Sequence, residues 1–274
     1  MGGTLYVVGT PIGNLADLTE RARTVLAEVD LVACEDTRRT GRLLAHVGIE
    51  VPMRALFAGN EAERTGEIVT ALRGGLDVAL VSDAGMPGIS DPGFPLVRTC
   101  VAEGIPVVAV PGPSAVTAAL VVSGFPMDRF VFEGFLPRAG AARRARLAAL
   151  AREERTSVLF ESPNRLAALL GDVAAHLGDR RVAVARELTK LHEEVLRGRA
   201  SEVLASIADR EVKGEVAVVI EGAASPEADL ATLVAAARAL VAKGSRKRDA
   251  AATVARGTGI ATGDVYAALL DERP

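Results

Sequence analysis

The stretch DVALVSDAGMPGISDPG, residues 77–93, joins a short apolar run to a loop rich in glycine and proline. Two other stretches have the same form: TLYVVG (4–9) continues into TPIGN (10–14), and PVVAV (106–110) continues into PGPS (111–114). A short apolar run that ends at turn-forming residues is typical of a buried strand. The three stretches therefore predict strands of one sheet, each followed by a rigid loop.

Helical patterns separate the predicted strands along the first half of the chain. A fourth apolar run, VDLVAC (29–34), also predicts a strand. Helices are predicted near residues 18–28, 38–47, 60–73, 93–104 and 114–123. Strands that alternate with helices indicate right-handed crossovers and a mainly parallel sheet, and continuous apolar strands indicate a sheet covered on both faces.

The second half predicts another sheet after Gly124-Phe125-Pro126, where we place a lobe boundary. Its strands are predicted at 129–134, 156–161, 181–186, 193–197 and 215–221, with helices near 141–152, 164–177 and 201–209. The short link between 181–186 and 193–197 favours a hairpin, and hence a mixed sheet. The expected organisation is an α/β chain with two αβα lobes, residues 1–124 and 125–222.

A change in amino-acid composition after Glu221 predicts a small helical module at 228–274. GAASPE (222–227) has the composition of a linker, and helices are expected at 228–243, 245–256 and 262–271. Ser245 and Thr262 are the expected N-caps, and GTGIATG (257–263) is the expected turn between the last two helices. The order resembles a helix-turn-helix.

Composition and charge exclude several classes of protein. A formal net charge of −3 disfavours a general nucleic-acid-binding domain, although a local basic patch remains compatible with it. Cys34 and Cys100 stand alone in apolar surroundings and are expected in the core, and the three histidines lack metal-ligand spacing, so no metal is expected. The chain starts without a signal-peptide pattern, and its longest apolar stretch, 107–126, is interrupted by prolines. We therefore expect a cytoplasmic protein with no membrane segment.

The three glycine- and proline-rich loops are expected to meet in one ligand-binding cleft. Ligands of open α/β sheets bind outside the carboxyl ends of the strands, where all three loops lie. Gly-Thr-Pro at 9–11 is not a G-x-G-x-x-G motif, and no G-x-x-x-x-G-K-[ST] motif occurs, so the loops favour a ligand with adenosine and an amino acid but no phosphate. The alternative is that they are only tight turns. Ser114 lies outside any nucleophile-elbow motif, which argues against a serine hydrolase.

The same loops, in this order, resemble those of the tetrapyrrole-methylase superfamily, the class III methyltransferases that use S-adenosylmethionine. The stretches that carry the resemblance are LYVVGTPIGNLADLTERA, VACEDTRRTGRLL, ALVSDAGMPGISDPGFPLV, VPGPSAVTAAL, DRFVFEGFLPR, LFESPNRL, ARELTK and KGEVAVVIEG, within residues 5–222. Two histidines frequent in that superfamily are absent here, where Ala58-Gly59 and Asn164 stand, so neither can act as a base. The resemblance implies a tetrapyrrole methylase-like fold, a cofactor cleft between the lobes and a homodimer.

The resemblance also implies which residues hold the cofactor, S-adenosylmethionine. Carried over by motif, they are Gly9, Thr10, Pro11, Asp83, Ala84, Gly85, Met86, Ser114, Ala115, Phe160, Ala217 and Val218.

Within the superfamily the chain is most similar to the branch that acts on ribosomal RNA. That branch methylates the ribose 2′-oxygen of a cytidine in the decoding centre of 16S ribosomal RNA, within the small ribosomal subunit. A hydroxyl is a poor nucleophile, so a base or a neighbouring cation is expected to assist it. The candidates are Lys190 and Glu187 in the charged link before 193–197, and Glu35. The alternatives are a solvated hairpin turn for the first two, and a helix N-cap at Glu35-Asp36-Thr37.

Basic clusters supply the candidate RNA contacts. They are Arg38, Arg138, Arg143, Arg144 and Arg146, with Arg246, Lys247 and Arg248 in the helical module. Such clusters can neutralise phosphates, but charge runs of this kind are more often solvated helix faces. Two other functions stay open: a methyltransferase of the same fold that acts on a small molecule such as a tetrapyrrole, and a non-catalytic ribosome-assembly module. A small substrate would leave the basic module without a role.

Overall fold

A five-stranded parallel sheet forms the centre of the first lobe in the computed structural model, which describes residues 2–223, 230–256 and 260–271. Its strand order is β3-β2-β4-β1-β5, and every neighbouring pair is parallel. The strands are β1 (Leu5–Val8), β2 (Leu31–Cys34), β3 (Met53–Ala55), β4 (Val78–Val81) and β5 (Val107–Val110). The predicted parallel sheet is confirmed, and β3 is an additional short edge strand that its sequence did not indicate.

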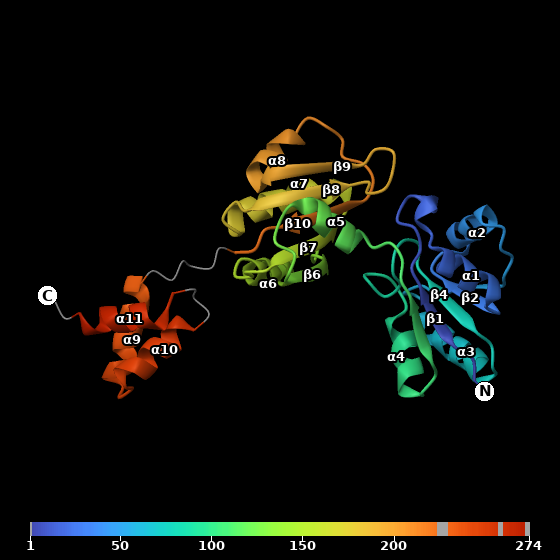
Figure 1. Ribbon diagram of the computed structural model, residues 1–274. Coiled ribbons are helices and arrows are strands. Elements are labelled where there is room, and N and C mark those ends of the chain that lie inside the picture. Colours follow the sequence, from blue (N-terminus) through green and yellow to red (C-terminus); the bar gives the residue numbers. More distant parts are fainter. Residues whose placement is uncertain (1, 224–229, 257–259, 272–274) are drawn as a thin grey trace. The chain divides into compact units, whose positions relative to one another are not determined.

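Helices cover both faces of this sheet (Figure 1). On one face, α3 (Glu61–Arg73) and α4 (Phe94–Ala102) bury apolar side chains against the strands. On the other face, α1 (Glu20–Glu28) and α2 (Thr37–His46) do the same, and a short 3-10 helix, η1 (Leu15–Asp17), precedes α1. The strands are apolar on both sides because both sides are buried, as the sequence predicted.

The second lobe contains a mixed sheet in the order β6-β7-β10-β8-β9. Its strands are β6 (Phe130–Phe135), β7 (Thr156–Glu161), β8 (Arg181–Arg186), β9 (Glu194–Arg199) and β10 (Val216–Ile220). β6 and β7 are parallel, and the remaining pairs are antiparallel. The predicted β8–β9 hairpin is therefore confirmed. One face is covered by α6 (Gly140–Leu150), α7 (Pro163–His176) and α8 (Ala200–Ser206).

Helix α5 (Ala115–Ser123) covers the other face of the second sheet, although it was expected to end the first lobe. Its residues Val116, Ala119 and Leu120 share a core with Val158 of β7 and Ala183 of β8. Gly124, with φ of 80°, ends this helix in the left-handed region, so the break at Gly124-Phe125-Pro126 that suggested a lobe boundary marks the end of α5. The chain therefore passes between the lobes at residues 111–114, ahead of the predicted position.

A second compact unit, residues 223–274, follows the first unit of residues 1–222. It contains α9 (Leu230–Ala242), α10 (Lys247–Ala255) and α11 (Thr262–Leu270), which share a small apolar core. The expected N-caps are wrong, because Arg246 and Ala261 occupy those positions. The Ser245 N–H instead donates to the Leu240 carbonyl and closes the turn after α9. The proposed linker at 222–227 and turn at 257–263 lie partly outside the described residues.

Both cysteines are buried and unpaired, as expected for small core residues. Within the parts of the chain that the structure describes, we find no helix with the length and apolar character needed to cross a lipid bilayer.

Candidate active site

Loops from adjacent strands of the first sheet meet at their carboxyl ends. The N–H of Gly9, at the end of β1, donates to the carbonyl of Val110 in β5 at 3.0 Å. Thr10 and Gly85 exchange two backbone hydrogen bonds of 2.9 and 3.1 Å, which joins the loop after β1 to the loop after β4. The Thr10 hydroxyl also donates to the Ser82 carbonyl at 3.1 Å. The predicted convergence of the three loops is confirmed.

Glycine is required in two of these loops by their contact with each other. A Cβ atom on Gly9 would lie 2.7 Å from the Cα of Gly112, and one on Gly112 would lie 2.7 Å from the Gly9 carbonyl oxygen. Both distances are shorter than side-chain carbons tolerate, so the loops can approach only through glycine. Gly9, Thr10 and Pro11 are buried beneath the cavity described next and are absent from its lining. These three residues therefore pack behind the residues that line the cavity.

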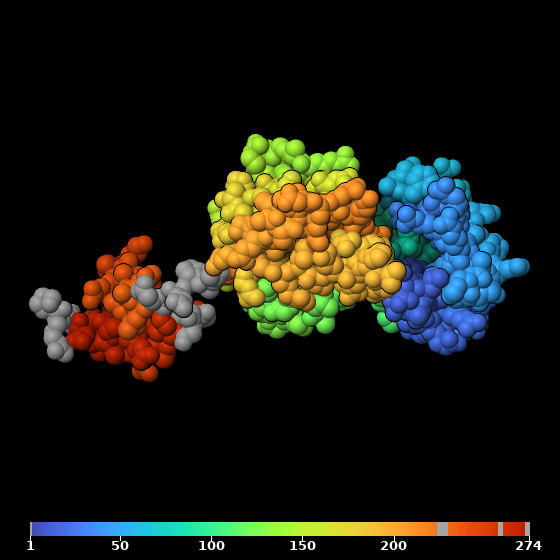
Figure 2. Space-filling model, turned by 90° about the horizontal axis from the view of Figure 1, so that it is seen from above, coloured from blue at the N-terminus to red at the C-terminus, as the bar shows by residue number. Residues whose placement is uncertain are grey.

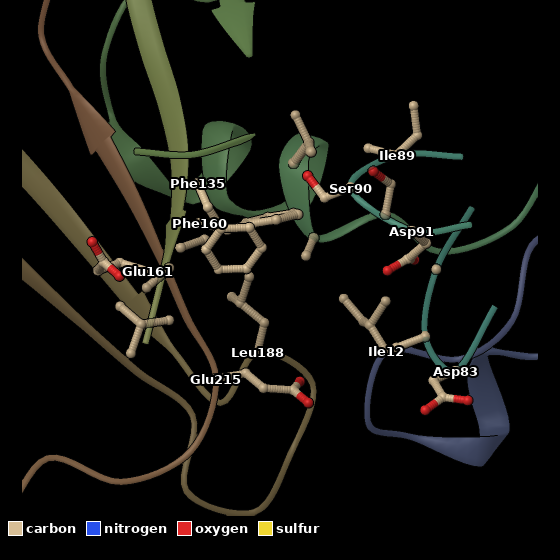
Figure 3. Close-up of a pocket in the computed structure, with 18 of the residues that line it drawn as sticks. Ile12, Asp83, Ile89, Ser90, Asp91, Phe135, Phe160, Glu161, Leu188 and Glu215 are labelled. Carbon is tan, nitrogen blue, oxygen red and sulfur yellow. The ribbon is translucent and has the colours of Figure 1, made fainter. Parts of the chain in front are cut away.

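A cavity of about 450 Å³ lies between the two lobes (Figure 3). The first lobe contributes Ile12, Glu35, Arg39, Asp83, Ala84, Gly85, Met86, Ile89, Ser90 and Asp91, and the start of α5 contributes Ser114, Ala115 and Val116. The second lobe contributes Phe135, Phe160, Glu161, Ser162, Pro163, Ala185, Leu188, Gly214, Glu215, Val216 and Ala217. Its size falls within the usual range for a small-molecule site.

Most of the residues predicted to contact the cofactor line this cavity. They are Asp83, Ala84, Gly85, Met86, Ser114, Ala115, Phe160 and Ala217. The exceptions are Gly9, Thr10 and Pro11, which are buried and do not line it, and Val218, which belongs to the buried core on the other face of the second sheet. Successive side chains of a strand point to opposite faces, so Ala217 and Val218 cannot both face the cavity.

Acidic side chains dominate the polar part of the lining. Five acidic residues and one basic residue, Arg39, line the cavity, and Arg39 Nη1 lies 3.4 Å from the Asp83 Oδ2. Two of the acidic residues pair with cations outside the lining, Glu161 with Arg165 at 3.3 Å and Glu215 with Lys190 at 3.2 Å. Burial, the charge of Glu35 and the charge of Asp83 together raise the pKa of Asp91 to about 6, against a lowering hydrogen bond with Ser82. Burial and the charge of Asp83 also raise the pKa of Glu35. A cavity of this charge favours a cationic ligand and disfavours phosphates.

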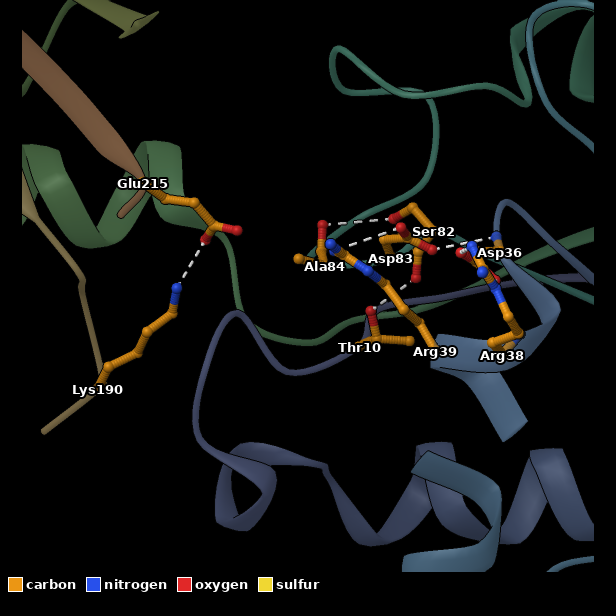
Figure 4. Close-up of polar contacts among 9 residues, drawn as sticks. All are labelled: Thr10, Asp36, Arg38, Arg39, Ser82, Asp83, Ala84, Lys190 and Glu215. Atoms are coloured by element: carbon orange, nitrogen blue, oxygen red, sulfur yellow. Dashed lines mark hydrogen bonds and ion pairs between the residues drawn. The ribbon is translucent and has the colours of Figure 1, made fainter. Parts of the chain in front are cut away.

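Lys190 and Glu187, two of the predicted catalytic residues, are absent from the cavity lining, and they pair with each other beside Glu215, which lines it. The Lys190 ammonium lies 2.8 Å from Glu187 Oε1. It also lies 3.2 Å from Oε2 of Glu215, a cavity residue, and Figure 4 draws this second contact. Burial would lower the pKa of Lys190, but the hydrogen bonds to these two carboxylates raise it overall. The hydrogen bond from Lys190 correspondingly lowers the pKa of Glu187. Lys190 is therefore a stable cation, which is unsuited to accept a proton.

The link between β8 and β9 also reaches the first lobe. A Cβ atom on Gly13 would lie 2.5 Å from Cγ of Lys190, so the lysine stem contacts the backbone of the loop after β1. Figure 2 shows the gold link lying against this dark blue loop. Glu187 and Thr189 have φ of 52° and 67°, a left-handed conformation that is uncommon outside glycine. The link is thus a defined structure as well as a hairpin turn.

The alternative interpretation of residues 35–37 holds for Asp36. Its carboxylate caps α2 by accepting from the Arg38 N–H at 2.8 Å, and it also pairs with the Arg38 guanidinium. Glu35, which follows β2, lines the cavity instead. One residue of the motif therefore serves the helix and its neighbour faces the site.

The basic residues of α6 differ in their surroundings. Arg143 is mostly buried and pairs with Asp172 of α7 at 2.6 Å, so it holds two helices together. Arg146 pairs with Glu133 of β6. Arg138 and Arg144 are exposed, as are Arg246 and Arg248 in the second unit. Arg138, which precedes α6, and Arg144 therefore have the exposure that a phosphate contact needs, and Arg146 is also exposed although it pairs with Glu133.

Sequence reasoning did not single out Asp91, Phe135 or Leu188 as site residues. Asp91 could have been included, because it lies in the same glycine- and proline-rich loop as Asp83. Phe135 and Leu188 carry no comparable local signal, and they reach the cavity through the geometry of the second lobe. Across the described residues, no group of three or more His, Cys, Asp and Glu side chains is arranged to hold a metal ion.

Comparisons with known proteins agree on one family. The sequence model of the tetrapyrrole (corrin/porphyrin) methylases matches residues 4–204. Ribosomal RNA small subunit methyltransferase I of Mycobacterium tuberculosis (strain H37Rv) is 49% identical over 275 residues, covering 99% of this chain and 96% of the relative. The protein of that name from Thermotoga maritima is 52% identical over 220 residues, covering 80% of this chain and 99% of the relative.

Solved structures give the same fold. Uroporphyrin-III C-methyltransferase from Thermus thermophilus, complexed with S-adenosyl homocysteine, matches with a TM-score of 0.58 at 20% identity, covering 80% of this chain and 97% of that one. At that identity the likeness concerns the fold. Together with the matched family model and the near full-length relatives, it establishes that the chain belongs to the tetrapyrrole methylase family.

Proposed function

We propose that this chain is an S-adenosylmethionine-dependent methyltransferase that acts on the RNA of the small ribosomal subunit. The observation that carries the proposal is the 49% identity to a ribosomal RNA small subunit methyltransferase I along 99% of the chain. A shared fold alone does not fix the acceptor, but similarity at this level along nearly the whole chain includes the second lobe and the helical unit, and so supports a shared acceptor.

The cavity fits the cofactor by its chemistry. S-adenosylmethionine combines an adenosine with an amino acid and a positively charged sulfonium, and it carries no phosphate. The apolar second-lobe wall, with Phe160 and Ala217, suits the adenine, while Glu35, Asp83 and Asp91 of the first lobe suit the cationic part. The bound group would supply an electrophilic methyl carbon. The lobes would hold donor and acceptor in line, which is where most of the rate arises in such reactions.

The three proposed catalytic residues have different roles in this proposal. The acceptor is a ribose 2′-hydroxyl, which must lose its proton as it takes the methyl group. Glu35, with its raised pKa and its place in the lining, is the better proton acceptor. Glu187 has a lowered pKa and is a weaker base, and its role is to hold Lys190 beside Glu215. Lys190 supplies positive charge that stabilises the hydroxyl oxygen as its proton leaves.

We assign phosphate contacts to six basic residues. They are Arg38, Arg138 and Arg144 in the first unit, all exposed, and Arg246, Lys247 and Arg248 at the start of α10, of which Lys247 is half-buried. Cations at a helix N-terminus oppose the helix dipole, so helix stability does not explain these last three. The Thermotoga maritima relative is matched over 220 residues, the length of the first unit alone. Contacts within the first unit are therefore central to recognition, and the second unit adds to them.

The finer parts of the proposal concern the acceptor atom and the assembly. We propose that the acceptor is the 2′-oxygen of a cytidine in the decoding centre of 16S ribosomal RNA. The protein would work as a homodimer in the cytoplasm, where its substrate is assembled. Light scattering of the purified chain tests the dimer, since a monomer mass at working concentration contradicts it.

One labelling experiment tests the activity. The protein is incubated with methyl-labelled S-adenosylmethionine and, separately, unmodified small ribosomal subunits, free ribosomal RNA or a tetrapyrrole precursor. The expected result is label in the subunits, recovered as 2′-O-methylcytidine after digestion to nucleosides. Label only in the tetrapyrrole contradicts the proposal and supports the small-molecule alternative. Cofactor binding with no label in any acceptor supports a non-catalytic assembly module.

A further inference from the structure

Aromatic residues are scarce in this chain but gather beside the cavity. The sequence has 7 phenylalanines, 2 tyrosines and no tryptophan. The ring of Phe160 lies 5.0 Å from that of Phe132 and 5.8 Å from that of Phe135, measured between ring centroids. Phe135 and Phe160 both line the cavity. A third of the chain's aromatic residues therefore cluster here, two of them in the cavity lining and Phe132 packed behind Phe160.

An irregularity in β6 brings Phe135 to this wall. Residues three apart on a regular strand point to opposite faces, so Phe132 and Phe135 would normally diverge. Here the pairing with β7 shifts between Phe132 and Gly134, so that Phe132 lies beside Val158 and Phe135 beside Phe160. Both therefore share the cavity side of the sheet. Bulges of this kind are common next to active sites, where they redirect a side chain.

Gly134 makes this bulge possible and ties it to the first lobe. Its φ of 61° lies in the left-handed region that favours glycine. A Cβ atom there would lie 3.3 Å from the Ser90 hydroxyl oxygen, so the bulge sits against the loop after β4. Ser90 itself has φ of 66°, and its neighbour Ile89 lines the cavity. Phe135 of the second lobe and Ile89 of the first lobe both line the same cavity (Figure 3).

Phe135 remains 55% exposed although it lines the cavity, and Ile89 remains 44% exposed. Phe160 is less exposed and lies among the core residues next to Ala217 and Leu188. The enclosed ring of Phe160 suits the adenine of the methyl donor. The exposed ring of Phe135 then remains free to contact another flat group. An acceptor ribose can reach the cavity only if its nucleotide leaves the base stack, and the displaced base then needs a new apolar partner.

We propose that Phe135 is the stacking platform for a nucleobase of the RNA acceptor, the base of the methylated nucleotide or its neighbour. This inference rests on the proposed function and adds the residue that positions the acceptor. Stacking of a base on an aromatic side chain contributes about 1–3 kcal/mol, or about 5- to 150-fold in affinity. Phe135 acts by positioning, and it takes no part in proton or methyl transfer.

The kinetic test compares substitutions at Phe135. Phe135→Ala is expected to lower kcat/KM for unmodified small ribosomal subunits by about 5- to 150-fold, with an unchanged Kd for S-adenosylmethionine. Phe135→Tyr should retain the wild-type rate, and Phe135→Leu, which keeps the apolar bulk but lacks a flat ring, should resemble Phe135→Ala. Phe94→Ala is the matched control, because Phe94 is 63% exposed and lies outside the cavity lining.

A binding test does not require turnover. The chain has no tryptophan, so Phe135→Trp places a single fluorophore at the site. Its fluorescence should be quenched by unmodified small subunits and unaffected by S-adenosylmethionine alone. The fluorescence of Phe94→Trp should be unaffected by either. Full activity in Phe135→Ala, or quenching by S-adenosylmethionine alone, would overturn the inference. A change of oligomeric state in Phe135→Ala would overturn it too, by making Phe135 an interface residue. Absence of methylation by the wild-type protein would instead contradict the proposed function.

Discussion

Replacement of Asp91 by asparagine is expected to stabilise the protein at neutral and alkaline pH. Asp91 lies in the loop after β4 and shares the cavity with Glu35 and Asp83. Burial and the charges of those two residues raise its pKa from 3.8 to about 6. An acid whose pKa is higher in the folded state binds more protons there than in the unfolded state. The contribution of Asp91 to the free energy of unfolding therefore falls as the pH rises from about 4 to about 6. Above pH 6 the ionised carboxylate destabilises the folded state by the full amount.

The size of the effect follows from the same shift. Two pKa units correspond to at most about 3 kcal/mol, and solvent screening of this partly exposed carboxylate reduces the expected penalty to about 1–2 kcal/mol. Asparagine has nearly the same shape and can still accept a hydrogen bond from Ser82, but it cannot ionise. Asp91→Asn should raise the free energy of unfolding by about 1–2 kcal/mol at pH 8, and leave it nearly unchanged at pH 4.

The assay is thermal unfolding followed by circular dichroism between pH 4 and pH 8, without ligand. The gain corresponds to a rise in Tm of about 2–8 °C at pH 8 for a unit of this size. Asp128→Asn, which removes an exposed carboxylate outside the cavity lining, is the control and should show little change at any pH. A loss of stability in Asp91→Asn that is equal at pH 4 and pH 8 would refute the reasoning, because it would show a structural role independent of charge.

Other perturbations give equally distinct results. Lys190→Ala should lower kcat by about 10- to 100-fold without changing the Kd for S-adenosylmethionine, and Lys190→Arg should restore part of the rate; an unchanged kcat in a folded Lys190→Ala protein rules out the charge-stabilising role. Gly112→Ala should cost about 1–3 kcal/mol in thermal unfolding, because its Cβ would lie 2.7 Å from the Gly9 carbonyl, whereas Gly66→Ala, with open space around it, should not destabilise. A variant in which Arg246, Lys247 and Arg248, at the start of α10, are all replaced by alanine should bind small subunits with a weaker salt dependence. The slope of log affinity against log salt concentration should fall by about 2, and weaker binding with an unchanged slope would exclude phosphate contacts there. Removal of the second unit should leave cofactor binding intact and weaken only subunit binding, and loss of cofactor binding in a folded truncated protein would contradict this division of roles.

Much of the fold could be predicted because its signals are local. Short apolar runs that end in glycine and proline mark β1, β4 and β5, since only buried strands need such runs and only rigid turns need such residues. The same pattern indicated that loops from neighbouring strands meet at one edge of the sheet. It also led to Asp83, because a carboxylate directly after a buried strand lies at that edge.

The sequence could not predict which of the two sheets helix α5 packs against. The sequence of α5 indicates a helix, and the left-handed Gly124 indicates where it ends. Neither signal says which sheet receives the apolar face, because that depends on which surface remains uncovered once both sheets have formed. The same reason separates Ala217 from Val218, and Arg143, which pairs with Asp172, from its exposed neighbour Arg144.

The sequence by itself therefore determined the α/β class, the two sheets, the cofactor loops and, through its motifs, the family. Only the tertiary structure decided how the second lobe completes the site. It placed Lys190 between two carboxylates, gathered Glu35, Asp83 and Asp91 in one cavity, and turned Phe135 toward it through the bulge at Gly134. Strands and turns depend on interactions between near neighbours along the chain, whereas charge pairing and side-chain direction depend on strand register and on residues far away in sequence.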